Sequence, residues 1–147
     1  MPTHTNAIHR ILDANLNRAK EGLRVCEEVV RFIIESRTLA EEFKRIRHSL
    51  DRASKKLRYA ESLLKNRSSE TDVGRTLNKH ELERGGYADI FIANIQRVKE
   101  SIRVLEEFGK LKDPKIAIGF KRIRYDVYAI EKRAMGKIAP TRKTSFS

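Results

Sequence analysis

The chain of 147 residues contains no tryptophan, one cysteine and three prolines, and it has no long apolar run. A single cysteine, Cys26, excludes an internal disulfide and a cysteine-based metal framework. No stretch is apolar enough for a membrane span, and residues 1–10 lack the apolar centre of a signal peptide. We therefore expect a soluble cytoplasmic protein without a membrane partner.

Sequence motifs of the common catalytic classes are also missing. There is no GxxxxGK[ST], GxGxxG or HExxH pattern, and the four histidines share no spacing. These absences remove the usual phosphate-binding loops, the helical zinc site and a nucleophile–histidine pair. Arginine combined with carboxylate remains, and guanidinium groups bind phosphate or carboxylate through two parallel hydrogen bonds.

Basic residues are in clear excess. Thirty-two lysines and arginines against 20 acidic residues give a net charge of +12. Such an excess favours an anionic partner, either a phosphorylated small molecule or nucleic acid. Dense charge of both signs also serves solubility and surface ion pairs, so the charge alone does not choose between these roles.

Apolar residues recur at spacings of three and four, the period of an amphipathic helix, along four segments. Thr38, with Glu41 three residues later, indicates a capping box at the start of the second helix. Asp113 followed by Pro114 indicates the start of the fourth. We predict an all-α antiparallel helical bundle made of two long hairpins. The expected helices cover about 6–35, 38–64, 87–110 and 113–135.

These helices fit one domain, residues 1–136, with a long loop between its two hairpins. The loop, about 66–86, is longer than compact domains usually contain, which indicates a functional or disordered segment. The first hairpin then covers about 6–65 and the second about 87–135. We expect residues 137–147 to form a basic flexible tail.

The two hairpins repeat each other in sequence. Residues 14–32 align without gaps to residues 93–111 with nine of nineteen positions identical, and the pentapeptide FKRIR occurs twice. Two copies predict a pseudo-twofold bundle. The apolar positions vary between the copies while polar ones are kept, which indicates that the kept polar residues have a role that depends on their position in the bundle. The identical polar pairs are Asn15/Asn94, Arg18/Arg97, Glu21/Glu100, Arg24/Arg103, Glu27/Glu106, Glu28/Glu107, Arg45/Arg122 and Arg47/Arg124.

Each repeated set has a purely structural alternative. Asn15 lies beside the apolar stripe with Arg18 and Gly22, and it either contributes to a site or fixes the register of the bundle. Glycine costs about 1 kcal/mol in mid-helix, so Gly22 indicates room for a ligand or for a close helix. The alternating charges at Arg24 and Glu28 form a salt-bridge ladder, a site or a dimer face.

The repeated ANxxR–E–R–EE helices, the Asp72-Val73-Gly74 turn and the doubled FKRIR resemble a known family. This family comprises the monofunctional hydroxymethylpyrimidine-phosphate kinases of thiamine biosynthesis, which occur alone or fused to the N-terminus of thiamine-phosphate synthase. The resemblance covers about residues 11–132. Its most specific stretches are 13–25 and 103–111.

The resemblance implies a kinase that converts hydroxymethylpyrimidine phosphate into the diphosphate with ATP and Mg²⁺. It implies a phosphorylated aminopyrimidine and a nucleotide as ligands and a functional link to thiamine-phosphate synthase, and a homodimer stays open. A substrate phosphate is ionised at neutral pH and can attack ATP without a strong base.

In this hypothesis Arg18, Arg97, Arg47 and Arg124 clamp phosphates, and Glu27, Glu106 or Asp72 brings the metal. Asn15 and Asn94 hold the pyrimidine edge, as asparagine holds adenine, and Gly22 and Gly74 line the site. The predicted catalytic residues are Arg18, Arg97, Glu27, Glu106 and Asp72.

Other functions remain open. An arginine-lined isomerase or mutase for an anionic metabolite would need neither ATP nor metal. A basic helical nucleic-acid-binding module fits the net charge, but the few aromatics and the repeated acids argue against it. A scaffold or dimerisation module without chemistry is the third alternative.

Overall fold

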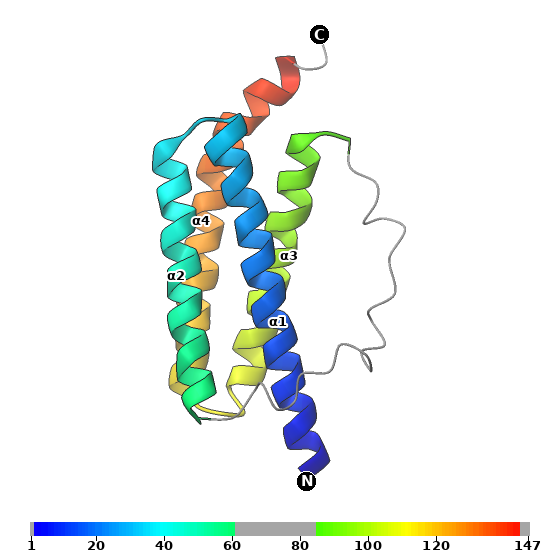
Figure 1. Ribbon diagram of the computed structural model, residues 1–147, viewed down its shortest axis with the longest axis vertical. Helices are drawn as coiled ribbons and strands as arrows, with labels where there is room; N and C mark the ends of the chain where they lie inside the picture. Colours follow the sequence, from blue (N-terminus) through cyan, green and yellow to red (C-terminus); the bar gives the residue numbers. More distant parts are fainter. Residues whose placement is uncertain (1, 61–84, 145–147) are drawn as a thin grey trace.

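The computed structural model describes residues 2–60 and 85–144, and the regular structure in these two segments is helical throughout. Figure 1 shows the helices packed side by side, with α1 and α4 running one way and α2 and α3 the other. The predicted all-α bundle is confirmed. Its elements are α1 (Pro2–Glu28), the π-helix η1 (Val29–Ile33), α2 (Arg37–Ala60), α3 (Tyr87–Gly109) and α4 (Pro114–Thr144).

The closest packing joins α1 to α3. Helix α3 also packs on α4, and α2 completes the bundle through contacts with α1 and α4. The order around the bundle is therefore α1, α3, α4, α2, and neighbouring helices are antiparallel. None of the helices in the described ranges contains a stretch long and apolar enough to cross a membrane.

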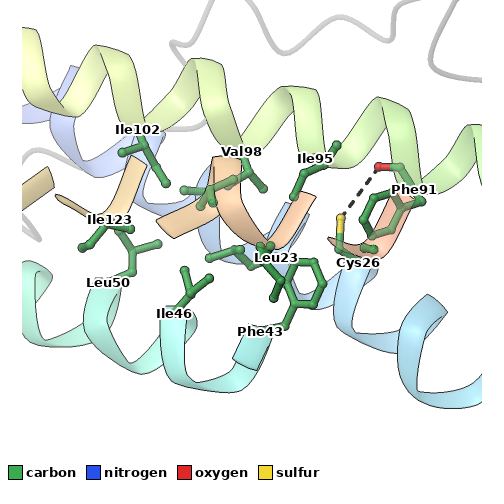
Figure 2. Packing of buried hydrophobic residues seen from close by; sticks show 14 of the residues in the cluster. Leu23, Cys26, Phe43, Ile46, Leu50, Phe91, Ile95, Val98, Ile102 and Ile123 are labelled. Carbon is green, nitrogen blue, oxygen red and sulfur yellow. Dashed lines mark hydrogen bonds between the residues drawn. The ribbon is translucent and has the colours of Figure 1, made fainter. Parts of the chain in front are cut away.

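The predicted apolar stripes form the core. Figure 2 shows side chains from all four helices meeting between the backbones, and most of them are fully buried. Phe43 of α2 and Phe91 of α3 pack edge to face with ring centroids 6.0 Å apart, a favoured aromatic geometry. Burial of these stripes supplies the main driving force for folding. The labelled residues of Figure 2 are Leu23, Cys26, Phe43, Ile46, Leu50, Phe91, Ile95, Val98, Ile102 and Ile123.

The end of the first helix differs from the prediction. We expected one α-helix to residue 35, but η1 follows Glu28, and the Ile34 N–H donates to the Val29 carbonyl at 3.0 Å, in π-helical spacing. The wider turn shifts the helical register, so Ile33, three residues after the buried Val30 in the apolar spacing of the first segment, is 50% exposed. Glu35 then ends the segment with a left-handed φ of 59°.

The start of the second helix also differs by a small step. The Leu39 N–H donates to Ser36 Oγ at 3.3 Å, so Ser36 caps α2 and the capping box predicted at Thr38 is wrong. The other predicted cap is confirmed. The Lys115 N–H donates to Asp113 Oδ1 at 2.9 Å at the start of α4.

The tail prediction is wrong where the structure describes the chain. Helix α4 continues past Gly136 to Thr144, and Ile138 is fully buried in the core. Burial of one large aliphatic side chain outweighs the cost of Gly136 within a helix. Most of the predicted loop at 66–86 lies outside the described residues.

Candidate functional site

In the first copy, Glu27 is the centre of an ion-pair cluster between α1 and α2. Its carboxylate is buried, and Arg47 Nε donates to Oε1 at 3.2 Å. Arg24 Nη1 lies 3.6 Å from the other oxygen, Oε2. Arg24 also pairs with Glu28 at 3.4 Å, which is the salt-bridge ladder considered from the sequence.

The second copy repeats this cluster between α3 and α4. Arg124 donates from Nε to Glu106 Oε2 at 2.7 Å and from Nη2 to Oε1 at 3.4 Å. These hydrogen bonds raise the pKa of the Arg124 guanidinium above its usual value. Arg103 lies 3.6 Å from Glu106 and 2.9 Å from Glu107. The contacts equivalent in sequence are thus equivalent in space.

The two clusters lie at opposite ends of the α1–α3 pair. Next to Glu27, the Cys26 thiol donates to the Phe91 carbonyl at 3.8 Å, near the start of α3 (Figure 2). Glu106 lies about 22 Å of helix rise further along α3. Arg47 and Arg124 therefore do not converge with each other, and one chain does not bring all four arginines of the clamp hypothesis to one place.

The buried carboxylates do not fit the predicted Mg²⁺ site. Glu27 and Glu106 each face two guanidinium groups, which neutralise the charge that a cation would need. Within residues 2–60 and 85–144, no three His, Cys, Asp or Glu side chains are grouped to hold a metal. The predicted Asp72 and Gly74 lie outside the described residues.

The middle of the α1–α3 pair is where Gly22 is needed. A Cβ on Gly22 would lie 2.6 Å from Val98 Cγ2 and 3.0 Å from the Asn94 carbonyl oxygen. Of the two explanations that the sequence left open, the structure shows the close helix. Glycine here lets α1 approach α3 more closely than any other residue type permits.

The two repeated asparagines flank this close approach. Asn15 donates from Nδ2 to the Ile11 carbonyl, and Asn94 donates to the Ile90 carbonyl, both at 2.8 Å within their own helices. Neither asparagine bonds across to the other helix within the described residues, so register is not fixed by such a bond. The side-chain oxygen of each amide has no partner in that part of the chain, which leaves it able to accept a hydrogen bond from a ligand.

Arg18 and Arg97 lie on the solvent side of the same contact. Arg18 is one turn before Gly22 and Arg97 is next to Val98, so the two lie within about one turn of each other in height. At about 100° per residue, both side chains flank the outer edge of the α1–α3 contact. Arg18 is half-buried and Arg97 exposed, and neither makes an ion pair or hydrogen bond in the described part of the chain.

Five of the predicted site residues therefore line the α1–α3 contact, which we call the α1–α3 face: two are buried in the contact, two are half-buried and Arg97 is exposed. Two guanidinium groups without carboxylate partners and two amides with open acceptors suit a planar anionic ligand. The residues of the α1–α3 face are Asn15, Arg18, Gly22, Asn94 and Arg97.

A hollow beside η1 was not predicted from the sequence. It has a volume of about 470 Å³ and lies between the end of the first helix and the start of α2. The link of the first hairpin is two residues longer than that of the second, which was the available signal. The hollow is lined by Glu27, Arg31, Glu35, Arg37, Ala40, Glu41 and Lys44.

Comparison with known proteins decides the family. The profile of the ThiD2 family matches residues 10–133. The chain belongs to the ThiD2 family. No solved structure matches it.

The ThiD2 chain is also similar to longer curated proteins. It is 46% identical over 131 residues to the thiamine-phosphate synthase of Synechocystis sp., covering 88% of this chain and 37% of that protein. For the thiamine-phosphate synthase of Nostoc punctiforme the identity is 44%, with 88% and 36% covered. For that of Rhodopirellula baltica it is 36%, with 95% and 38% covered. The chain thus spans little more than a third of these relatives, and their names connect it with thiamine biosynthesis.

Proposed function

We propose that this ThiD2 chain is a phosphotransferase that converts hydroxymethylpyrimidine phosphate into the diphosphate, with Mg²⁺–ATP as the phosphate donor. We further propose that the α1–α3 face binds the phosphorylated pyrimidine. The observation that supports this site is the pair of guanidinium groups of Arg18 and Arg97, which have no partner in the described residues and flank one helix contact. The connection of the family with thiamine biosynthesis supports the choice of substrate.

The residues of the α1–α3 face match the parts of this substrate. Its phosphate carries up to two negative charges at neutral pH and accepts paired hydrogen bonds from Arg18 or Arg97. Its ring amino group can donate to the open side-chain oxygen of Asn15 or Asn94. Since the two copies present these groups in equivalent positions, one copy can hold the substrate phosphate while the other holds the group being transferred.

The reaction needs positioning more than it needs a base. An oxygen of the substrate phosphate attacks the γ-phosphorus of ATP, a new P–O bond forms, and the bond to the β-phosphate oxygen breaks so that ADP leaves with the electron pair. The attacking oxygen is already ionised, and guanidinium groups offset the charge of the transferred group. We assign no step to a metal held by Glu27 or Glu106, because arginines already occupy both carboxylates.

The two end clusters then have a structural role. Glu27–Arg47 joins α1 to α2 and Glu106–Arg124 joins α3 to α4, so each ion pair ties one hairpin together. These struts hold α1 and α3 in place, and the α1–α3 face depends on that placement.

Incubation of the chain with hydroxymethylpyrimidine phosphate, ATP and Mg²⁺ tests the activity, with the diphosphate and ADP followed by ³¹P NMR and mass spectrometry. Equal amounts of ADP and diphosphate are expected. An isomerase or mutase acting on the same anion would consume no nucleotide. Absence of the diphosphate with folded wild-type chain would overturn the kinase proposal.

Two variants test the site, and the repeat offers matched controls. Arg18→Ala and Arg97→Ala should each reduce turnover by a factor of about 100 or more without unfolding the bundle, because each removes a clamp on transferred charge. Arg45→Ala and Arg122→Ala remove equivalent exposed cations that also lack partners in the described chain, and they should retain activity. Wild-type rates in Arg18→Ala and Arg97→Ala would remove the α1–α3 face as the site.

A further inference from the structure

Helix α4 carries a stripe of two tyrosines between two lysines on its exposed surface. Lys121, Tyr125, Tyr128 and Lys132 follow one another at spacings of four, three and four, which places them on one face of the helix. Tyr125 is 53% exposed and Tyr128 is 41% exposed. We call these four residues the α4 stripe.

The tyrosine rings of the α4 stripe are held by cations. The Arg124 guanidinium carbon lies 5.2 Å from the ring centroid of Tyr125 and 5.7 Å from that of Tyr128. Lys121 Nζ lies 5.9 Å from the Tyr125 ring, and Lys99 Nζ lies 5.6 Å from the Tyr128 ring. Such contacts are attractive. Because Arg124 is anchored by the buried Glu106, the rings lie on a fixed support.

The first copy shows that the hairpin does not need these aromatics. His48 and Asp51 occupy the positions equivalent to Tyr125 and Tyr128. There Lys20 pairs with Asp51 at 2.9 Å, whereas the equivalent Lys99 lies over Tyr128 and pairs with Glu131 instead. Exposed tyrosines contribute little to the core. The equivalent helix of the first copy, α2, packs in the bundle without them, so folding does not explain the tyrosine pair.

The charges beside the rings favour an anionic ligand. Lys121 and Lys132 are exposed and have no ion pair or hydrogen bond in the described part of the chain. A second copy of this chain presenting the same stripe would bring lysines against lysines, which is unfavourable. An aromatic ring carrying a phosphate satisfies both features, since it stacks on tyrosine and its charge meets lysine.

We propose that the α4 stripe binds a nucleoside phosphate, with the base stacked on Tyr125 or Tyr128 and a phosphate held by Lys121 or Lys132. This site differs from the α1–α3 face. Lys99, which contacts Tyr128, is two residues from Arg97 and therefore lies on the opposite side of α3. The inference does not depend on the proposed kinase activity, because it concerns binding alone.

Calorimetric titration without the pyrimidine substrate measures nucleotide binding, with AMP, ATP, tripolyphosphate and an eight-nucleotide single-stranded DNA as probes. The variants below assign that binding to the α4 stripe rather than to a donor site of the proposed kinase. AMP or ATP should bind more tightly than their phosphates alone explain, so tripolyphosphate should bind about tenfold or more weakly than ATP. Binding of the DNA as well would identify nucleic acid as a source of the same ligand chemistry, and its absence would identify free nucleotides. Equal binding of ATP and tripolyphosphate, or no binding of any nucleotide, would overturn the proposal.

Paired variants separate stacking from charge. Tyr125→Leu with Tyr128→Leu should weaken AMP binding by about tenfold or more, whereas Tyr125→Phe with Tyr128→Phe keeps both rings and should stay within about twofold. His48→Ala, at the position in the first copy equivalent to Tyr125, is the matched control and should change nothing. Unchanged binding in the leucine variant, with helical content preserved, would overturn the proposal, as would a loss in the control of the same size. Arg18→Ala should bind AMP normally, so a failure of the kinase proposal would leave this result readable.

Discussion

The middle of the α1–α3 pair and its two ends use the same residue types differently. In the middle, Arg18 and Arg97 have no carboxylate partner among the described residues, whereas near the ends Glu27 and Glu106 are held by arginines from the neighbouring helix. When two repeated helices pack antiparallel, equivalent residues near their midpoints come together and equivalent residues near their ends move apart. Residues that are identical in the two copies therefore form one shared face where they lie near the helix midpoints. Where they lie near the helix ends, they form two separate ion-pair clusters.

The largest expected effect on stability comes from removing an ion pair near an end of the α1–α3 pair. Arg124→Ala removes the nearer of the two guanidinium groups that face Glu106, which is 5% exposed, and leaves Arg103 at 3.6 Å. This change should lower the free energy of unfolding by about 3 kcal/mol. Arg47→Ala should cost about 2 kcal/mol, because Arg47 makes one hydrogen bond to Glu27 while Arg124 makes two to Glu106. Urea unfolding followed by circular dichroism measures both. If they unfold like the exposed control Arg45→Ala, the end clusters are not struts.

The next largest effect on stability is expected at Gly22, in the middle of the α1–α3 pair. Gly22→Ala places a Cβ 2.6 Å from Val98 Cγ2 and should lower the free energy of unfolding by about 1–2 kcal/mol, since the strain of overpacking exceeds the gain in helix propensity. The control is Ser101→Ala, at the equivalent buried position of the second copy, which adds no bulk. Thermal unfolding of both variants measures the difference. A Gly22→Ala chain as stable as the wild type would show that α1 does not need glycine to approach α3.

A smaller gain in stability is expected at Glu35, in the link between the two helices of the first hairpin. Glu35 has a left-handed φ of 59°, a conformation that costs a non-glycine residue about 1 kcal/mol. Glu35→Gly should therefore raise the free energy of unfolding by about 1 kcal/mol. Glu35→Ala keeps the Cβ and should give no such gain. A stabilisation of equal size in both variants would assign the effect to the lost charge instead.

The smallest effect is a pH dependence at the end of α3. Hydrogen bonding from Lys110 lowers the pKa of Glu107 below its ordinary value of 4.5. The folded form therefore gains stability from the ionised carboxylate above that pH and loses it as the pH falls through the lowered pKa. Glu107→Gln should reduce the fall in the free energy of unfolding at pH values below 4.5, measured by urea unfolding at each pH. Glu21→Gln, which removes a carboxylate without a partner in the described chain, should leave that fall unchanged.

The spacing of apolar residues predicted most of the fold, because burial of apolar side chains decides which face of each helix points into the core. The stripe through Leu12, Leu16 and Leu23 is buried as expected, and the Asp113 cap is where the sequence placed it. The failures are local. The π-helix η1, and the choice of Ser36 over Thr38 two residues later as the cap of α2, depend on small differences in backbone hydrogen bonding. The spacing of apolar residues does not contain this information.

The residues of the proposed site were singled out from the sequence, but their arrangement was not. The repeat singled out Arg18 and Arg97 as well as Glu27 and Glu106, since alignment of two copies gives equivalence without position. Which of these residues meet depends on how α1 docks on α3. That docking is set by Gly22 and the closeness that it permits, a consequence of packing rather than of motif.

Equilibrium binding of hydroxymethylpyrimidine phosphate, measured by isothermal titration calorimetry without nucleotide, tests most directly whether the α1–α3 face holds the substrate phosphate. We expect Arg18→Ala, Arg97→Ala or both to weaken the affinity by about tenfold or more, and the exposed controls Arg45→Ala and Arg122→Ala to bind like the wild type. If the affinity is the same in all four variants, or falls equally in all four, the α1–α3 face does not hold the substrate phosphate.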